Sequence, residues 1–222
     1  MFIGHLAIGF AAKRAAPRAS LGVLVAATEL LDLLFPVFLL AGWEKVRIVQ
    51  DHNPFTRAEF TLYPWSHSLA AACVWGLVMG GAYWVATRYR RGSIAVGLLV
   101  VSHWVLDAIS HTPDMPLYPG PSPRIGLGLW NSVPGTMIVE GAMFTAGVWL
   151  YARHTRARDR IGTYGLWSFV LVMTGLYAAM VLGPRPPDAS AMGWAGLLFA
   201  LFLFWIAWFD RHREPGGGVS RT

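Results

Sequence analysis

The chain has 222 residues, of which 55% are hydrophobic and only 14% are charged, whereas about a quarter of the residues in a soluble domain carry a charge. Its net charge of +6 at pH 7 would suit a nucleic-acid-binding protein, but the basic residues lie in short loops between apolar runs. That distribution is typical of membrane proteins, so we exclude nucleic acid as a partner. The one cysteine, Cys73, lies inside an apolar run, which excludes a disulfide framework and a CxxC motif.

The apolar stretches predict an all-α fold, a polytopic transmembrane bundle of six to seven helices. They cover residues 2–12, 20–41, 66–87, 93–111, 134–152, 163–183 and 190–209. About 20 apolar residues are needed to cross a hydrocarbon core of about 30 Å, so the first stretch has the length of a half-helix. We expect one transmembrane domain over residues 1–210. The polar, glycine-rich remainder predicts a flexible cytoplasmic tail over residues 211–222.

Four basic stretches alternate with the apolar segments in a way that predicts the topology. They comprise residues 13–18, 88–91, 153–160 and the tail from Arg211, and they hold thirteen of the eighteen Lys and Arg. Seven crossings would place all four stretches in the cytoplasm, with the N-terminus outside and the C-terminus inside. We therefore expect a multi-pass protein of the inner (cytoplasmic) membrane, whose two long loops face outward.

Ionisable residues inside membrane helices are costly and mark pairing or function, and here they gather in the first five segments. Imidazole and carboxylate groups together suit a divalent metal such as zinc. Most of these groups lie in the outer half of the predicted bundle or at its boundary, so we expect a His/Asp metal site that opens to the outer (periplasmic) face. The groups are His5, Glu29, Asp32, His67, His103, Asp107, His111, Asp114 and Glu140.

The fourth segment has the most regular spacing of such groups. His103, Asp107 and His111 follow one another at i, i+4 and i+8, so they share one helix face. His103 and His111 lie about 12 Å apart along the helix axis, too far to ligate the same ion. Two neighbours can share an ion, and the third then supports a ligand, holds a second ion or contacts substrate. We expect His111 and the nearby Asp114 to support the site or contact substrate.

Several of these residues have a structural alternative. His5 and His67 lie at segment ends, where a histidine is ordinary at a membrane interface or as a helix cap. His103 would also suit a hydrogen-bonded interior position. Glu29 and Glu140 would also suit a hydrogen bond to a neighbouring helix.

Four short motifs occur in an order that resembles a known family. The chain is similar, over about its first 120 residues, to the YdjM-like (DUF457-type) family of bacterial membrane-bound, metal-dependent hydrolases. That family has an early GH, an acidic motif after the next apolar run, an HS motif and an SHxxxD motif. Its counterparts here are GHLAIGF (4–10), ELLDLLFP with Asp32, YPWSHS (63–68) and SHWVLD (102–107).

The resemblance implies a membrane-embedded metal-dependent hydrolase of the bacterial inner membrane. A divalent metal, with zinc as the expected ion, would be held by His67, Asp107 and one or two of His5, Asp32 and His103. Such an ion lowers the pKa of a bound water and polarises the scissile group.

Three carboxylates, Glu29, Asp32 and Glu140, are candidates for the general base of that reaction. A site at the membrane surface favours an amphiphilic ester or phosphoester as substrate, so membrane lipids are the expected partners. Two other hypotheses remain open. The polar cluster would also suit a cation or proton pathway in a small transporter or accessory protein. It would also suit a structural membrane protein whose polar groups only pair helices.

Overall fold

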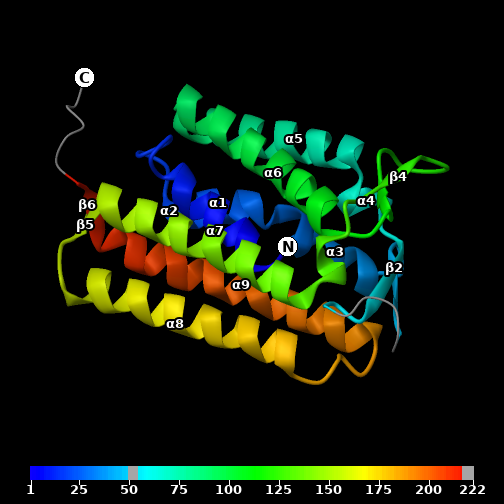
Figure 1. The fold of residues 1–222 in the computed structure, drawn as a ribbon. Helices are drawn as coiled ribbons and strands as arrows, with labels where there is room; N and C mark the ends of the chain where they lie inside the picture. The colour runs from blue at the N-terminus through cyan, green and yellow to red at the C-terminus, as the bar shows by residue number, and fades with distance from the viewer. Residues whose placement is uncertain (50–54, 217–222) are drawn as a thin grey trace.

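A computed structural model describes residues 1–49 and 55–216, and within them the chain forms one elongated helical bundle (Figure 1). The predicted all-α fold is confirmed. The helices are α1 (Ile3–Ala12), α2 (Leu21–Thr28), α3 (Leu30–Leu40), α4 (Pro64–His67), α5 (Leu69–Thr87), α6 (Arg90–Ser110), α7 (Val133–His154), α8 (Arg160–Leu182) and α9 (Ala189–Arg211), with a 3₁₀ turn at Leu129–Asn131. Short antiparallel pairs join β1 (Lys45–Ile48) to β2 (Ala58–Leu62), β3 (Met115–Pro116) to β4 (Arg124–Ile125), and β5 (Thr155–Ala157) to β6 (Arg213–Pro215).

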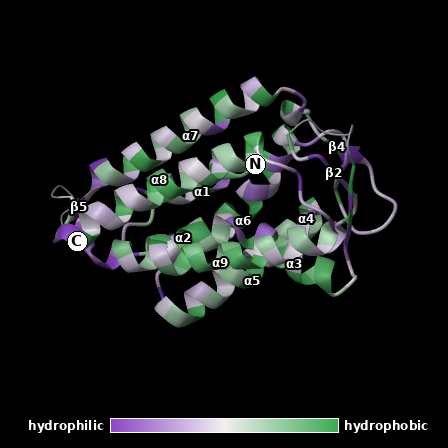
Figure 2. Ribbon diagram, turned by 90° about the horizontal axis from the view of Figure 1, so that it is seen from below, coloured by the Kyte–Doolittle hydropathy of each residue, from purple (hydrophilic) through white to green (hydrophobic). Residues whose placement is uncertain are grey.

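Five helices, α5 to α9, are long and apolar enough to cross a membrane, and the chain is a multi-pass membrane protein by that measure. The pair α2 and α3, bent by 56° at their junction, makes a sixth span if it is counted as one. Figure 2 shows that hydrophilic residues concentrate toward the ends of the bundle, near β5 and near β2 and β4. Of the predicted six to seven spans, the smaller number, six, therefore fits the structure.

The seventh crossing, predicted over residues 2–12, is not supported. Helix α1 has ten residues and rises about 15 Å, half the thickness of a hydrocarbon core. It begins in the middle of the bundle and runs to the end where α2 starts (Figure 1). The first segment is thus a half-helix, as its length predicted, and residues 1 and 3–7 are buried inside the bundle.

Residues 13–18, 88–91, 153–160 and 211–216, the described parts of the four basic stretches, lie at one end of the bundle, on the left of Figure 1. The guanidinium of Arg18 lies 4.7 Å from the centre of the Tyr89 ring, which joins the α1–α2 turn to the α5–α6 turn. The predicted flexible tail needs a correction, because α9 continues to Arg211 and β6 pairs with β5. Residues 217–222 lie outside the described residues.

A buried ion pair between Lys13 and Asp210 stabilises the basic end of the bundle. The Asp210 carboxylate accepts hydrogen bonds from Lys13 Nζ at 2.9 Å, from the Leu21 amide at 2.7 Å and from the Tyr151 hydroxyl at 2.7 Å. A buried carboxylate needs such partners, because desolvation strongly disfavours a lone charge. The group fixes α9 against α7 and against the turn between α1 and α2.

Small residues let two helix pairs approach closely, as is common in membrane bundles. A Cβ added at Gly76 of α5 would lie 2.8 Å from the Gly97 carbonyl oxygen of α6. A Cβ added at Gly147 of α7 would collide with the Ala7 carbonyl oxygen of α1. These contacts set the register of α5 on α6 and hold α1 against α7.

Candidate metal centre

Four helices bring five of the predicted site residues to one place inside the bundle. His5 comes from α1, Asp32 from α3, His67 from α4, and His103 and Asp107 from α6. Their ligand atoms form two overlapping groups, His5–His103–Asp107 and Asp32–His67–His103, in each of which all atoms lie within 4.8 Å of one another. The buried His and Asp side chains could therefore hold a metal ion.

Nitrogen and oxygen atoms alternate around the centre of this cluster. His67 Nε2 lies 3.3 Å from Asp32 Oδ1 and 3.6 Å from Asp107 Oδ2. His103 Nε2 lies 3.7 Å from the same Asp32 oxygen and 3.0 Å from the same Asp107 oxygen. Two ligands of a tetrahedral zinc ion, with bonds of about 2.0–2.1 Å, are separated by about 3.3 Å. The four observed separations are close to that value.

A break between α2 and α3 orients His103. Helix α2 ends at Thr28 and α3 begins at Leu30, so the Thr28 carbonyl is free to accept a hydrogen bond from His103 Nδ1 at 2.5 Å. Nε2 then carries the lone pair, and among the described residues it has no hydrogen-bond partner. A buried imidazole nitrogen that faces two carboxylate oxygens without a hydrogen bond fits a metal ligand, whose other ring nitrogen is normally held by a carbonyl or carboxylate.

A chain of hydrogen bonds orients His67 in the same way. Glu44, which precedes β1, accepts the Trp65 and Ser66 amides at 2.9 Å each and the Ser66 hydroxyl at 2.6 Å. Because the Ser66 hydroxyl donates to Glu44, its oxygen accepts from His67 Nδ1 at 2.7 Å, which leaves Nε2 free to face the cluster. Sequence reasoning missed Glu44, since no local spacing relates it to a residue 22 positions later.

His5 completes the inner side of the cluster. Its ring stacks on His103 with 3.7 Å between the ring centres, and its Nε2 lies 3.0 Å from Asp107 Oδ1. The α-amino group of Met1 contacts both His5 Nε2, at 3.0 Å, and the Asp107 carboxylate. This positively charged group pairs with the buried Asp107 carboxylate, which would otherwise be costly to bury.

Burial divides the cluster into a closed side and an open side. The side chains of His5, His67, His103 and Asp107 are at most 5% exposed, whereas the Asp32 side chain is 41% exposed. Asp32 is therefore the member that solvent or a substrate reaches most readily.

The two predicted glutamates lie beside the cluster, outside both groups. Glu140 Oε2 accepts the Phe2 amide at 2.8 Å and the Gly4 amide at 3.2 Å, so it caps the start of α1. Glu29 is buried at the break between α2 and α3, and its Oε1 has no hydrogen-bond partner among the described residues. Glu140 holds the helix that carries His5 through Oε2, and its Oε1, like Glu29 Oε1, has no hydrogen-bond partner among the described residues.

His111 and Asp114 form a separate polar group near the end of α6. His111 Nδ1 lies 2.9 Å from Asp114 Oδ1, and the Tyr63 hydroxyl donates to the same oxygen at 2.9 Å. Burial, and next the Asp114 charge, raise the pKa of Tyr63 well above its usual value. The Tyr63 ring lies between the His67 and His111 rings, with centres 5.6 and 6.1 Å away. The Tyr63 ring therefore stands between the His111–Asp114 pair and the metal cluster.

The arrangement suits a divalent cation, because three imidazoles and two carboxylates converge in a buried space. Comparison of the chain with protein-family models, with curated proteins and with solved structures found no match. The functional argument therefore depends on the geometry and chemistry of this cluster.

Proposed function

We propose that this chain is a membrane-embedded, metal-dependent hydrolase whose ion is zinc. The observation that carries the proposal is His103 Nε2, which is buried without a hydrogen bond while it faces Asp32 and Asp107. His67 and His5, which belong to the two overlapping groups around His103, supply the remaining ligands. Thr28, Ser66 and Glu44 hold the two ring orientations on which ligation depends.

When bound, zinc supplies a water of lowered pKa and a polarised scissile group. Asp32 lies on the open side of the cluster, where it is placed to accept a proton from an attacking water. Glu29 and Glu140 each have one oxygen without a hydrogen-bond partner among the described residues, but both side chains are buried, so both are less suited to that task. The cluster lies in the half of the bundle away from the basic end. We assign it to the periplasmic side of a bacterial inner membrane, where an amphiphilic ester or phosphoester is accessible.

The first test is the metal content of the purified protein. We expect zinc in a stoichiometric amount by mass spectrometry in the wild type, and its loss in Asp107→Ala. The control is Asp159→Ala, which changes an exposed carboxylate that caps α8 and should keep its zinc. Negligible metal in all three proteins would overturn the proposal.

The second test is catalysis. We expect the zinc-loaded wild type to hydrolyse a p-nitrophenyl ester or phosphoester, and expect chelation to remove that activity. Asp32→Asn should lose turnover and bind zinc more weakly than the wild type, because it removes the charge of one of the two carboxylates that face His67 and His103. Bound zinc without hydrolysis, together with cation flux in proteoliposomes, would favour the transporter hypothesis instead.

A further inference from the structure

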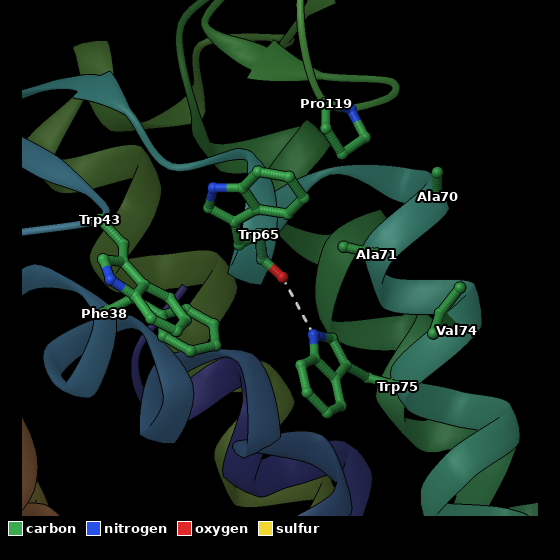
Figure 3. A pocket seen from close by; sticks show the side chains of 8 residues that line it. All are labelled: Phe38, Trp43, Trp65, Ala70, Ala71, Val74, Trp75 and Pro119. Carbon is green, nitrogen blue, oxygen red and sulfur yellow. Dashed lines mark hydrogen bonds between the residues drawn. The ribbon is translucent and has the colours of Figure 1, made fainter. Parts of the chain in front are cut away.

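An apolar pocket of about 650 Å³ lies between the end of α3 and the start of α5 (Figure 3). Three indole rings form much of its wall, and none of its lining residues carries a charge. The Trp75 indole N–H donates to the Trp65 carbonyl at 2.9 Å, so this polar atom is satisfied within the wall. The lining residues are Phe38, Trp43, Trp65, Ala70, Ala71, Val74, Trp75 and Pro119.

The pocket and the candidate metal centre lie at the same height along the long axis of the bundle. Antiparallel helices α5 and α6 meet where Gly76 approaches Gly97 and where Gly80 approaches Ser93. Continuing this register places the first two turns of α5, which line the pocket, alongside the end of α6 that carries the two ligands of the SHxxxD motif. Helix α4 connects the two places directly, because Trp65 lines the pocket and His67, two residues later, faces the cluster.

The open side of the pocket continues into the surface that a bilayer would cover. Val74 and Trp65 are more than half exposed, and α5 is one of the five helices long and apolar enough to span a membrane. A ligand that enters from this side arrives through lipid, and the pocket volume is in the range of about 300–1,000 Å³ that ordinary ligands occupy.

We propose that this pocket binds one alkyl chain of a membrane amphiphile, whose ester or phosphoester head group then lies at Asp32 and His67. The proposal rests on the proposed hydrolase function and deepens it, because it makes a lipid the substrate. The amphiphile enters sideways from the bilayer, and the indole walls discriminate against substrates without an alkyl chain.

The probe for this site is a phosphatidic acid with a photoreactive diazirine in one acyl chain, added in small amount to phosphatidylcholine vesicles that hold the full chain. After irradiation, we expect peptide mass spectrometry to find the label concentrated on residues 65–75 and on the end of α3. Ala71→Trp fills the pocket and should lose most of this label. The matched control is Leu77→Trp on the same helix, whose side chain is 77% exposed and outside the pocket, and it should keep the label.

A chain-length comparison adds a functional readout. The wild type should hydrolyse p-nitrophenyl laurate faster than p-nitrophenyl acetate. Ala71→Trp should lose this preference for the long chain, whereas Leu77→Trp, outside the pocket, should keep both activities and the zinc content. Label spread evenly over α5, α8 and α9 and unaffected by Ala71→Trp would overturn the pocket assignment, even in a zinc-loaded protein. Absence of zinc in the wild type would overturn the hydrolase proposal instead, so the two failures are distinguishable.

Discussion

The Ser66→Ala substitution tests how the candidate metal centre is held together. The Ser66 hydroxyl oxygen accepts a hydrogen bond from His67 Nδ1, and the same hydroxyl donates a hydrogen bond to Glu44. Without that hydroxyl, His67 loses the group that fixes which nitrogen faces the cluster. The ring can then rotate, or place its proton on Nε2, and in either case it ligates poorly.

The structure sets the size of the effect. Glu44 still accepts the Trp65 and Ser66 amides in the variant, so α4 remains in place and only the His67 orientation is lost. Loss of a partner of this kind lowers metal affinity by about 10- to 100-fold. Because Glu44 still binds the backbone of α4, we expect a loss of zinc affinity at the lower end of this range. A loss of about tenfold corresponds to about 1.4 kcal/mol of binding free energy.

The assay is a zinc titration of the purified protein against a fluorescent chelator of known affinity. Ser68→Ala is the matched control, because Ser68 accepts the Ala71 amide at 3.1 Å and caps α5. It should lower the stability by about 1 kcal/mol and leave the zinc affinity unchanged. An unchanged affinity in Ser66→Ala, or an equal loss in both variants, would refute the assigned role of the Ser66–Glu44 chain.

Two further predictions concern the packing that supports the site. Asp210→Ala leaves Lys13 buried without its counter-charge and should lower the free energy of unfolding by about 3–5 kcal/mol, measured by denaturation in mixed micelles. An unaltered unfolding curve would contradict the described burial of this pair. Gly147→Leu should push α1 away from α7, because its side chain would meet the Ala7 carbonyl, at a cost of about 1–3 kcal/mol and with a loss of bound zinc. Gly81→Leu is the control, since a Cβ there meets nothing within 4 Å, and destabilisation equal to that of Gly147→Leu would contradict the packing argument.

The long helices could be predicted from the sequence because hydropathy alone determines them. Each of the predicted segments over 66–87, 93–111, 134–152, 163–183 and 190–209 overlaps one helix that is long enough to span a membrane. The break at Glu29 could not be predicted in this way. Pro36, the residue that would ordinarily mark a break, lies inside α3.

The grouping of the five candidate ligands was predicted in outline from residue chemistry and from their positions near one boundary. The supporting residues were not, because Thr28 acts through a backbone carbonyl and Glu44 through a contact between distant segments. The same reason applies to β6, which forms only because β5, far away in the sequence, offers a partner. Local sequence patterns do not predict such contacts between segments that are far apart in the chain.

The attachment of α1 to α7 has a consequence for how the protein is made. Phe2 and Glu140, which join the two helices, are 138 positions apart in the chain. At a synthesis rate of about 5–20 residues per second, the ribosome delivers Glu140 roughly 7–28 s after Phe2. During that interval His5 lies on a half-helix too short to cross the bilayer and without its main partner. The candidate metal centre therefore assembles only after α7 has been made, and a chain interrupted before α7 would contain all five candidate ligands but lack the glutamate that holds the helix of His5.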